Sequence, residues 1–444
     1  MTTRRTFMHT LGTGAAGLAG LTACSGGGSS STTGGGTPPV TPPAGSSSIL
    51  VVVQIQGGND WLNTLPPLTG TNATAYRTNR PVIGIPETGL APLNMAGTGD
   101  VGLNKALLGF EALHAAGLVA WIPGIGMPNP NLSHFTSIDL WGQGAAVPDG
   151  TGWLGRWGDA AFGTTDVLRG LSLTSDTMLM LHGRKRDFVS ILSTSDYVFP
   201  AYLRSSTALP DSNFLKTAFV QGLNAGLADP ALPAVALAAS EGKLWYDAQS
   251  AFSSLIKART PTVAYPGDST YSVTGLSSQL SSQLKLVAQM IASGIPAQVY
   301  TVRLGGFDTH SNEVVDYPKL MGALGGSLKA FYDDLAAIDT TVNGQTVKAQ
   351  ERVLMVAWSE FGRRIKENNG GTDHGTAALS FCVGKMVKGG FYGGGYPDLT
   401  KPDSNGNMAF TTDFRTLYAT VIDRFLSGDS KAVLGSTYAP LGFL

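Results

Sequence analysis

The chain has 444 residues and only two cysteines, Cys24 and Cys382. At most one disulfide bond can form between them, and none can form if Cys24 is modified in another way. A framework of disulfide bonds is therefore excluded, and the stability of the fold must come from buried apolar side chains. Cys382 lies in the apolar run 377–383, which is typical of a small buried side chain.

Charged residues are scarce, at 14% of the chain, and the formal net charge is −1. There is no block of lysines and arginines of the kind that binds a phosphate backbone, so nucleic acid is not an expected partner. Long apolar runs are also missing. The stretch 11–23 is too short and too weakly apolar to span a bilayer as a helix of the mature protein.

The first 24 residues are typical of an export signal. A pair of arginines within residues 3–7 forms a twin-arginine signature, and residues 21–24 resemble a lipobox whose cysteine becomes lipidated. Residues 25–48 are mainly Gly, Ser, Thr and Pro without charge, which predicts a flexible linker. We therefore expect twin-arginine export to the periplasm or outer membrane, membrane attachment through lipid on Cys24, and one folded domain at 49–444.

Through most of this domain, continuous apolar runs alternate with segments in which apolar residues recur at helical spacing. This order predicts an α/β fold. Strands followed by helices and further strands favour an open, mainly parallel sheet with helices on both faces. The region 144–275 is expected to form insertions and a cap over one edge of the sheet. Strands are predicted at 49–56, 117–125, 297–304 and 352–357. Helices are predicted near 61, at 135–141, within 213–256, and at 276–293, 317–338 and 413–425.

Acidic residues and histidines follow three of the predicted strands. The carboxyl ends of parallel strands meet at one edge of a sheet, so these side chains are expected to converge. Four carboxylates and two histidines in one cleft would repel each other without a cation, which predicts a divalent metal site. Oxygen and nitrogen ligands suit zinc, manganese or magnesium-like ions, with one or two ions bound. The residues concerned are Asp60, Asp308, His310, Glu360, Asp373 and His374.

Three further residues are candidates for catalysis. Ser133 precedes a predicted helix, where it is either an N-cap or a nucleophile attacking a phosphate or sulfate ester at the anion-favouring helix N-terminus. His134 is a ligand, an acid or a packed side chain. Arg363, with its neighbour Arg364, either clamps the substrate anion or forms an ordinary surface pair.

The motifs GGNDWLNT, SHF, GGFDTH, SEFGR and GGTDHG follow one another in this order. With the twin-arginine signal, they make the chain resemble the exported bacterial family called domain of unknown function 1501. That family is grouped by similarity with the alkaline phosphatase and sulfatase superfamily. The resemblance implies a three-layer α/β/α fold with a central, mainly parallel sheet, inserted cap segments and metal ligands at strand ends.

The resemblance also implies roles for individual residues. It places Asp60, Asp373 and His374 on one ion beside a nucleophilic Ser133, and makes Asp308 with His310 the beginning of a second site. The two-metal phosphatases use a further late histidine, but no histidine follows His374 in this chain. Either Glu360 substitutes for it, or one ion binds as in sulfatases, or the site is degenerate.

These observations predict an exported, lipid-anchored, metal-dependent hydrolase of phosphate or sulfate esters, with a small anionic ester as substrate. A formylglycine enzyme is not favoured, because no Cys/Ser-x-Pro-x-Arg motif lies near Ser133. One alternative is a non-catalytic lipoprotein that keeps the fold as a binding or secretion-associated module. Another is a phosphotransferase or mutase.

Overall fold

The structure is a computed structural model that describes residues 48–95, 99–163, 166–194, 220–225, 233–271, 273 and 279–444. The expected export signal, the lipidated Cys24 and the linker up to residue 47 lie outside the described residues, as does part of the region 144–275. Among the described helices, none has both the length and the apolar character needed to cross a membrane.

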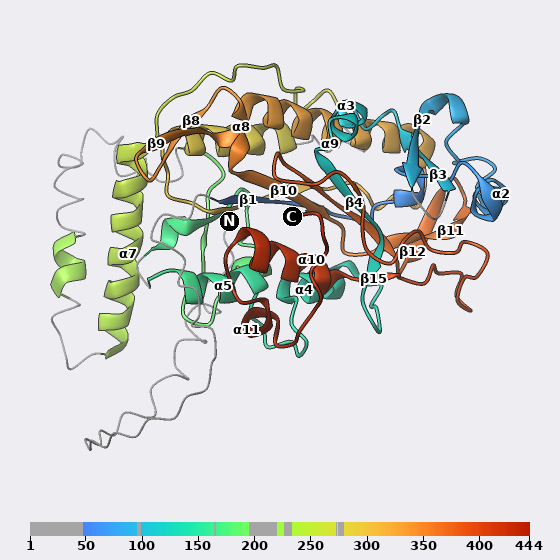
Figure 1. Ribbon diagram of the computed structural model, residues 1–444. Coiled ribbons are helices and arrows are strands. Elements are labelled where there is room, and N and C mark those ends of the chain that lie inside the picture. The colour runs from blue at the N-terminus through green and yellow to red at the C-terminus, as the bar shows by residue number, and fades with distance from the viewer. Residues whose placement is uncertain are drawn as a thin grey trace, which may run out of the picture. The chain divides into compact units, whose positions relative to one another are not determined.

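A nine-stranded sheet forms the centre of the described chain (Figure 1). In spatial order its strands are β14 (Gly390–Phe391), β4 (Val119–Gly126), β13 (Ala378–Val383), β10 (Val353–Trp358), β1 (Ile49–Ile55), β7 (Val299–Leu304), β5 (Gly170–Ser172) and β6 (Val189–Ser190), with β15 (Thr412–Asp413) beside β4. β1 is buried along its whole length and pairs in parallel with β10 and β7. β13 runs antiparallel to β10 and β4. The four predicted strands and the mainly parallel sheet are confirmed.

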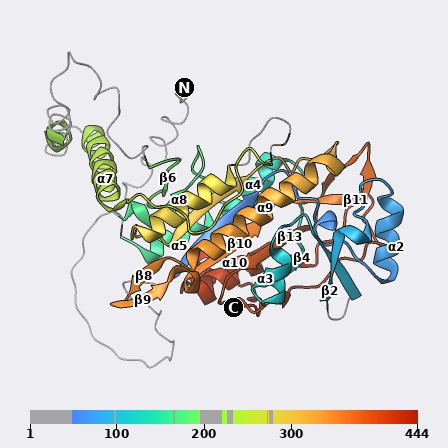
Figure 2. The ribbon, with the colours of Figure 1, turned by 90° about the horizontal axis from the view of Figure 1, so that it is seen from above.

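Helices cover both faces of this sheet (Figures 1 and 2). Alternate residues of β1 pack into different layers, with Val51 and Val53 in one apolar cluster and Leu50 and Val52 in the other. The first face carries α3 (Phe110–Ala115), α8 (Leu280–Ala292) and α9 (Glu313–Leu335). The second carries α4 (His134–Gln143), α5 (Trp153–Ala161), α10 (Phe414–Thr420) and α11 (Ser430–Leu434). Three layers around one sheet therefore position the loops at the strand ends.

The remaining elements are short or lie beside the main sheet. Three hairpins pair β2 (Leu90–Met95) with β3 (Gly99–Asn104), β8 (Asp339–Val342) with β9 (Gln345–Lys348), and β11 (Gly362–Asn368) with β12 (Gly371–Gly375). The other helices are α2 (Gly70–Asn79), α7 (Pro233–Leu255) and a π-helix (Val421–Phe425) that continues α10. Short 3-10 turns lie at Trp61–Asn63, Glu87–Gly89, Val167–Arg169, Leu179–Leu181 and Ala349–Glu351. The helix expected near residue 61 is only the first of these turns.

Part of the region expected to form a cap belongs to the sheet itself. β5 pairs in parallel with β7, and β6 extends the sheet beyond β5. α5 buries Trp153, Leu154 and Trp157 in the second layer. Strands of two and three residues are too short to show the alternation that reveals a strand in a sequence. The interpretation of this segment as an insertion was therefore wrong for residues 153–190.

Candidate functional site

The candidate site lies where the loops after β4, β7 and β10 meet at the carboxyl edge of the sheet. The β11–β12 hairpin follows β10 directly and lies near α2 at the same end of the domain (Figures 1 and 2). Together these segments place one ligand atom each of His134, Asp308 and His374 within 4.8 Å of one another. Segments far apart in the sequence thus bring two imidazoles and one carboxylate to one place.

His134, the first residue of α4, is held through its Nδ1 atom. This atom lies 2.7 Å from Oε1 of Glu360, which accepts its hydrogen bond and also accepts one from the backbone N–H of Gly57 at 2.8 Å. The bond to Glu360 raises the pKa of His134. The Nε2 atom is buried and has no hydrogen-bond partner among the described residues, although Oδ2 of Asp308 lies 3.4 Å away. His134 therefore presents its second nitrogen toward Asp308.

His374 on β12 is held in the same way. Its Nδ1 atom donates to the carbonyl oxygen of Leu132 at 2.8 Å. Its Nε2 atom lies 3.0 Å from Oδ1 of Asp308 and 3.0 Å from Nε2 of His310. Both imidazoles are thus oriented by a bond on one nitrogen and direct the other nitrogen to the same carboxylate.

Asp308 is the centre of this cluster. Its side chain is 48% exposed, and Oδ1 accepts a hydrogen bond from Arg363 at 2.7 Å. Partial burial raises the pKa of Asp308, but the bonds from Arg363 and His374 outweigh it and hold the pKa at about 2. The carboxylate is therefore ionised at neutral pH and open on one side.

Arg363 is fully buried and bonded to backbone carbonyl groups. It donates to Gly57, to Gly58 at 2.7 Å, to Phe307 at 3.0 Å and to Thr372 at 2.8 Å. A guanidinium group with these partners has little capacity left to bind a substrate anion. Its contacts join the loops after β1 and β7 to the hairpin and orient Asp308.

Asp60 lies apart from this cluster, in a buried ion pair with Arg80. Both carboxylate oxygens accept hydrogen bonds from that guanidinium, and Oδ1 does so at 2.8 Å. Burial raises the pKa of Asp60, but the charge of Arg80 and the hydrogen bonds from Glu313 and Arg80 together outweigh it, so that the net shift is downward. Glu313 lies beside the pair, and burial together with the negative charge of Asp60 raises its pKa well above the usual value.

Asp373 and His374 are adjacent on β12, where successive side chains of a strand point to opposite faces. Only His374 reaches Asp308. Asp373 is 45% exposed, bonds to Asn368, and lies 3.4 Å from Arg364 and 3.8 Å from Nδ1 of His310.

His310 lies at the exposed rim of the cluster, 3.0 Å from Oδ1 of Asp308. Desolvation and the charge of Arg363 lower its pKa. Its imidazole is therefore neutral at pH 7.

Ser133 occupies the N-cap position of α4, but its hydroxyl group makes no capping hydrogen bond. Its backbone N–H instead donates to the side chain of Asn131 at 2.8 Å. The serine is exposed and directly precedes His134. The capping interpretation is therefore not supported, and the serine is exposed at the N-terminus of α4.

The sequence interpretation missed Arg80 and Glu313, the buried partners of Asp60. Arg80 follows a polar helix and carries no motif around it, whereas Glu313 has the common pattern of an acid in the first turn of a helix. Neither pattern reveals burial. The pairing of His134 with Glu360 spans 226 residues, so no local spacing could predict it.

Residues 262–433 match the model of a family described as a protein of unknown function, DUF1501. The match supports the family resemblance found in the sequence motifs. It covers β7, α9, β10 and the hairpin, and therefore Asp308, Glu360 and His374, while Ser133 and His134 precede it. No curated protein matches the chain.

Proposed function

We propose that the protein is a metal-dependent hydrolase of phosphate or sulfate esters with an alkaline-phosphatase-like fold, exported and attached to a membrane through lipid on Cys24. The observation that carries this proposal is the arrangement of His134 and His374. Each imidazole is fixed through Nδ1 and directs Nε2 to the ionised carboxylate of Asp308. This is how metal-binding histidines are oriented in proteins, with the non-ligating nitrogen bonded to a carboxylate or carbonyl group.

The donor set favours one ion. Two imidazole nitrogens and one carboxylate oxygen form a frequent catalytic zinc site, which leaves a position open for water or substrate. The same donors also suit non-haem iron, and manganese accepts them less selectively. A second ion has no comparable set among the described residues, because Asp60 is bonded to Arg80 and Asp373 lies outside the cluster.

A bound ion would supply a positive charge for an ester oxygen and lower the pKa of a coordinated water molecule. The chain supplies the remaining functions. The hydroxyl group of Ser133 is open to solvent at the N-terminus of α4, where free backbone N–H groups and the helix dipole favour an anionic ester. The neutral imidazole of His310 can accept a proton at the rim. Arg363 holds Asp308 in place rather than contacting the substrate.

Replacement of Ser133 by alanine tests the role of its hydroxyl group. If the serine is the nucleophile, kcat for a chromogenic aryl phosphate or sulfate falls by more than about 100-fold, because removal of a nucleophile abolishes the covalent route. The metal content is expected to stay unchanged. Thr136→Ala, which removes an exposed hydroxyl group from the same helix, serves as the control. Undiminished turnover by Ser133→Ala would show that water attacks directly.

Replacement of Glu360 by glutamine tests the orientation of His134. The amide keeps the size of the side chain but loses the charge that stabilises the Nδ1–H donor of His134. The affinity for zinc is expected to fall by about 10–100-fold, measured by competition with a chelator. Glu367→Gln is the control, since that carboxylate accepts bonds from the backbone N–H groups of Val82 and Ile83 without contacting a histidine. An unchanged affinity in Glu360→Gln would contradict the proposed orientation.

A non-catalytic binding module is the second candidate, favoured by apolar side chains near the cluster in the sequence. Phe135 follows His134 and is 85% exposed, and Val314 and Val315 follow the loop of His310 and are 56% and 60% exposed. Exposed apolar groups beside a site are typical of partner contacts. Stoichiometric metal without turnover of any phosphate or sulfate ester would favour this function over hydrolysis.

A further inference from the structure

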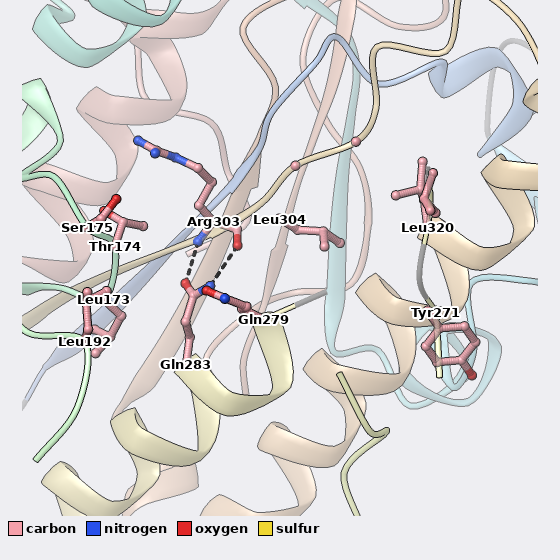
Figure 3. A pocket seen from close by; sticks show the side chains of 13 residues that line it. Leu173, Thr174, Ser175, Leu192, Tyr271, Gln279, Gln283, Arg303, Leu304 and Leu320 are labelled. Carbon is pink, nitrogen blue, oxygen red and sulfur yellow. Dashed lines mark hydrogen bonds between the residues drawn. The ribbon is translucent and has the colours of Figure 1, made fainter. Parts of the chain in front are cut away.

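A cavity of about 500 Å³ lies at the carboxyl ends of β5 and β7, close to the start of α8 and the side of α9 (Figure 3). This volume is within the range of small-molecule sites in proteins, which also occur at the carboxyl ends of strands in α/β sheets. Most of the lining is apolar. The apolar side chains come from Leu173, Leu192, Tyr271, Val273, Leu304 and Leu320.

Among the described residues of the lining, only Arg303 is charged, and its charge is already compensated. Its guanidinium group lies 3.1 and 3.3 Å from the two carboxylate oxygens of Asp176, and its Nε donates to Gln54 at 2.8 Å. A charged ligand would lose its hydration here without gaining a free opposite charge. The cavity is therefore suited to an uncharged ligand.

The neutral polar groups of the lining are also largely occupied. The side chain of Gln283 bonds to both backbone groups of Arg303, at 2.8 and 3.0 Å (Figure 3). The hydroxyl group of Thr174 donates to the carbonyl oxygen of Asp176 at 2.6 Å. Among the lining residues, Ser175 and Gln279 have polar side chains without a hydrogen bond to the described chain. They leave room for one or two hydrogen bonds to a ligand.

The cavity adjoins the loop that carries Asp308 of the candidate metal cluster. Gly305 and Gly306 line it, and Asp308 follows two residues after Gly306. Two peptide units span at most about 7 Å between Cα atoms. A group bound in the cavity would thus be close to the chain segment that presents Asp308.

We propose that this cavity binds an uncharged, mainly apolar organic group, such as an aromatic ring or a short hydrocarbon chain with one hydrogen-bonding atom. Two sources have this chemistry. One is the organic part of the ester that the site hydrolyses, which rests on the proposed function. The other is a separate small molecule, and this source does not depend on the proposed function.

The uncharged probe N-phenyl-1-naphthylamine, whose emission rises in apolar surroundings, tests the ligand class in a fluorescence titration of the purified protein. Saturable binding is expected, and it should be at least tenfold tighter than binding of 1-anilinonaphthalene-8-sulfonate, a related anion. Equal or tighter binding of the anion would contradict the proposal that the ligand is uncharged. Absence of saturable binding would contradict the proposal that the cavity is a binding site.

Two substitutions test the location. Ser175→Trp and Leu192→Trp add bulk at exposed lining positions, so the folded core is expected to remain intact. Each should raise the dissociation constant of the probe at least tenfold, whereas Thr136→Trp, at an exposed position of α4 that does not line the cavity, should leave it unchanged. Unchanged binding in both tryptophan variants would overturn the proposal. Metal content should be unaffected in all three.

Inhibition kinetics separate the two sources. If the cavity holds the organic part of the substrate, the probe raises KM for an aryl ester without changing kcat, and Ser175→Trp does the same. If it holds a separate ligand, the probe leaves KM unchanged or changes kcat. If no ester is hydrolysed but the probe binds in the cavity, the proposed function is wrong. The cavity is then a binding site for a separate ligand.

Discussion

Replacement of Asp308 by alanine is expected to lower the affinity for zinc by more than about 100-fold, beyond the effect usual for groups that only orient a ligand. Asp308 is the carboxylate toward which both His134 and His374 direct Nε2. It is ionised because Arg363 and His374 hold its pKa at about 2. Its removal would leave two imidazole nitrogens and no carboxylate directed to the ion. Elemental analysis of the purified protein and chelator competition measure the loss.

Asp373→Ala is the matched control for this prediction. Asp373 is about as exposed as Asp308 and lies 3.8 Å from His310, but its carboxylate bonds to Asn368 and faces Arg364. Its removal is expected to change the zinc affinity by no more than a few-fold. Equal losses in the two variants would support the assignment implied by the family resemblance, in which Asp373 and His374 share an ion. Retention of metal in both would exclude the cluster described here.

The architecture was predictable because its signals are local. β1 and β10 are buried on both faces, so nearly every position is apolar and each strand is visible as an almost continuous apolar run. α8 and α9 each bury one side against the sheet and therefore show helical spacing. The convergence of strand ends was expected from the parallel sheet, and it is seen for Asp308 and His374, whereas Asp60 is paired with Arg80.

The details of the site were not predictable to the same degree. The predicted strands do not include the glycine-rich segment 358–375, but it forms a hairpin whose turn contains Asn369 and Gly370, both with positive φ. Asn-Gly is a strong hairpin signal. Once the hairpin is recognised, the alternation along β12 separates Asp373 from His374, and alternation along β11 buries Arg363 while leaving Arg364 partly exposed.

The partners of Asp60 could not be inferred at all. A carboxylate after a strand and two glycines has the same local sequence whether it binds a metal or a buried arginine. The difference depends on Arg80, which is 20 residues away, and on Glu313, which is 253 residues away in the chain. Long-range pairing of single residues leaves no periodic pattern in a sequence, so only the structure distinguishes the two roles.

Replacement of Arg80 by methionine is expected to lower the free energy of unfolding by about 3–5 kcal/mol, because it leaves the buried carboxylate of Asp60 without its cation. Arg80 also donates to the backbone carbonyl groups of Ile365 at 2.9 Å and Arg364 at 2.8 Å, so its loss releases β11 as well. Urea unfolding followed by tryptophan fluorescence and circular dichroism measures the change. Arg184→Met is the control, because that arginine is 63% exposed in its pair with Asp149, and its loss should cost less than about 1 kcal/mol.

Asp60→Asn then distinguishes a structural carboxylate from a metal ligand. It leaves the buried guanidinium group of Arg80 without an anion, so a loss of stability similar to that of Arg80→Met is expected. The zinc affinity of the folded protein should be unchanged, because His134, Asp308 and His374 remain in place. The opposite result, a stable protein that no longer binds zinc, would restore Asp60 to the metal site. Loss of both properties in Asp60→Asn, with zinc binding preserved in Arg80→Met, would likewise assign Asp60 to the ion.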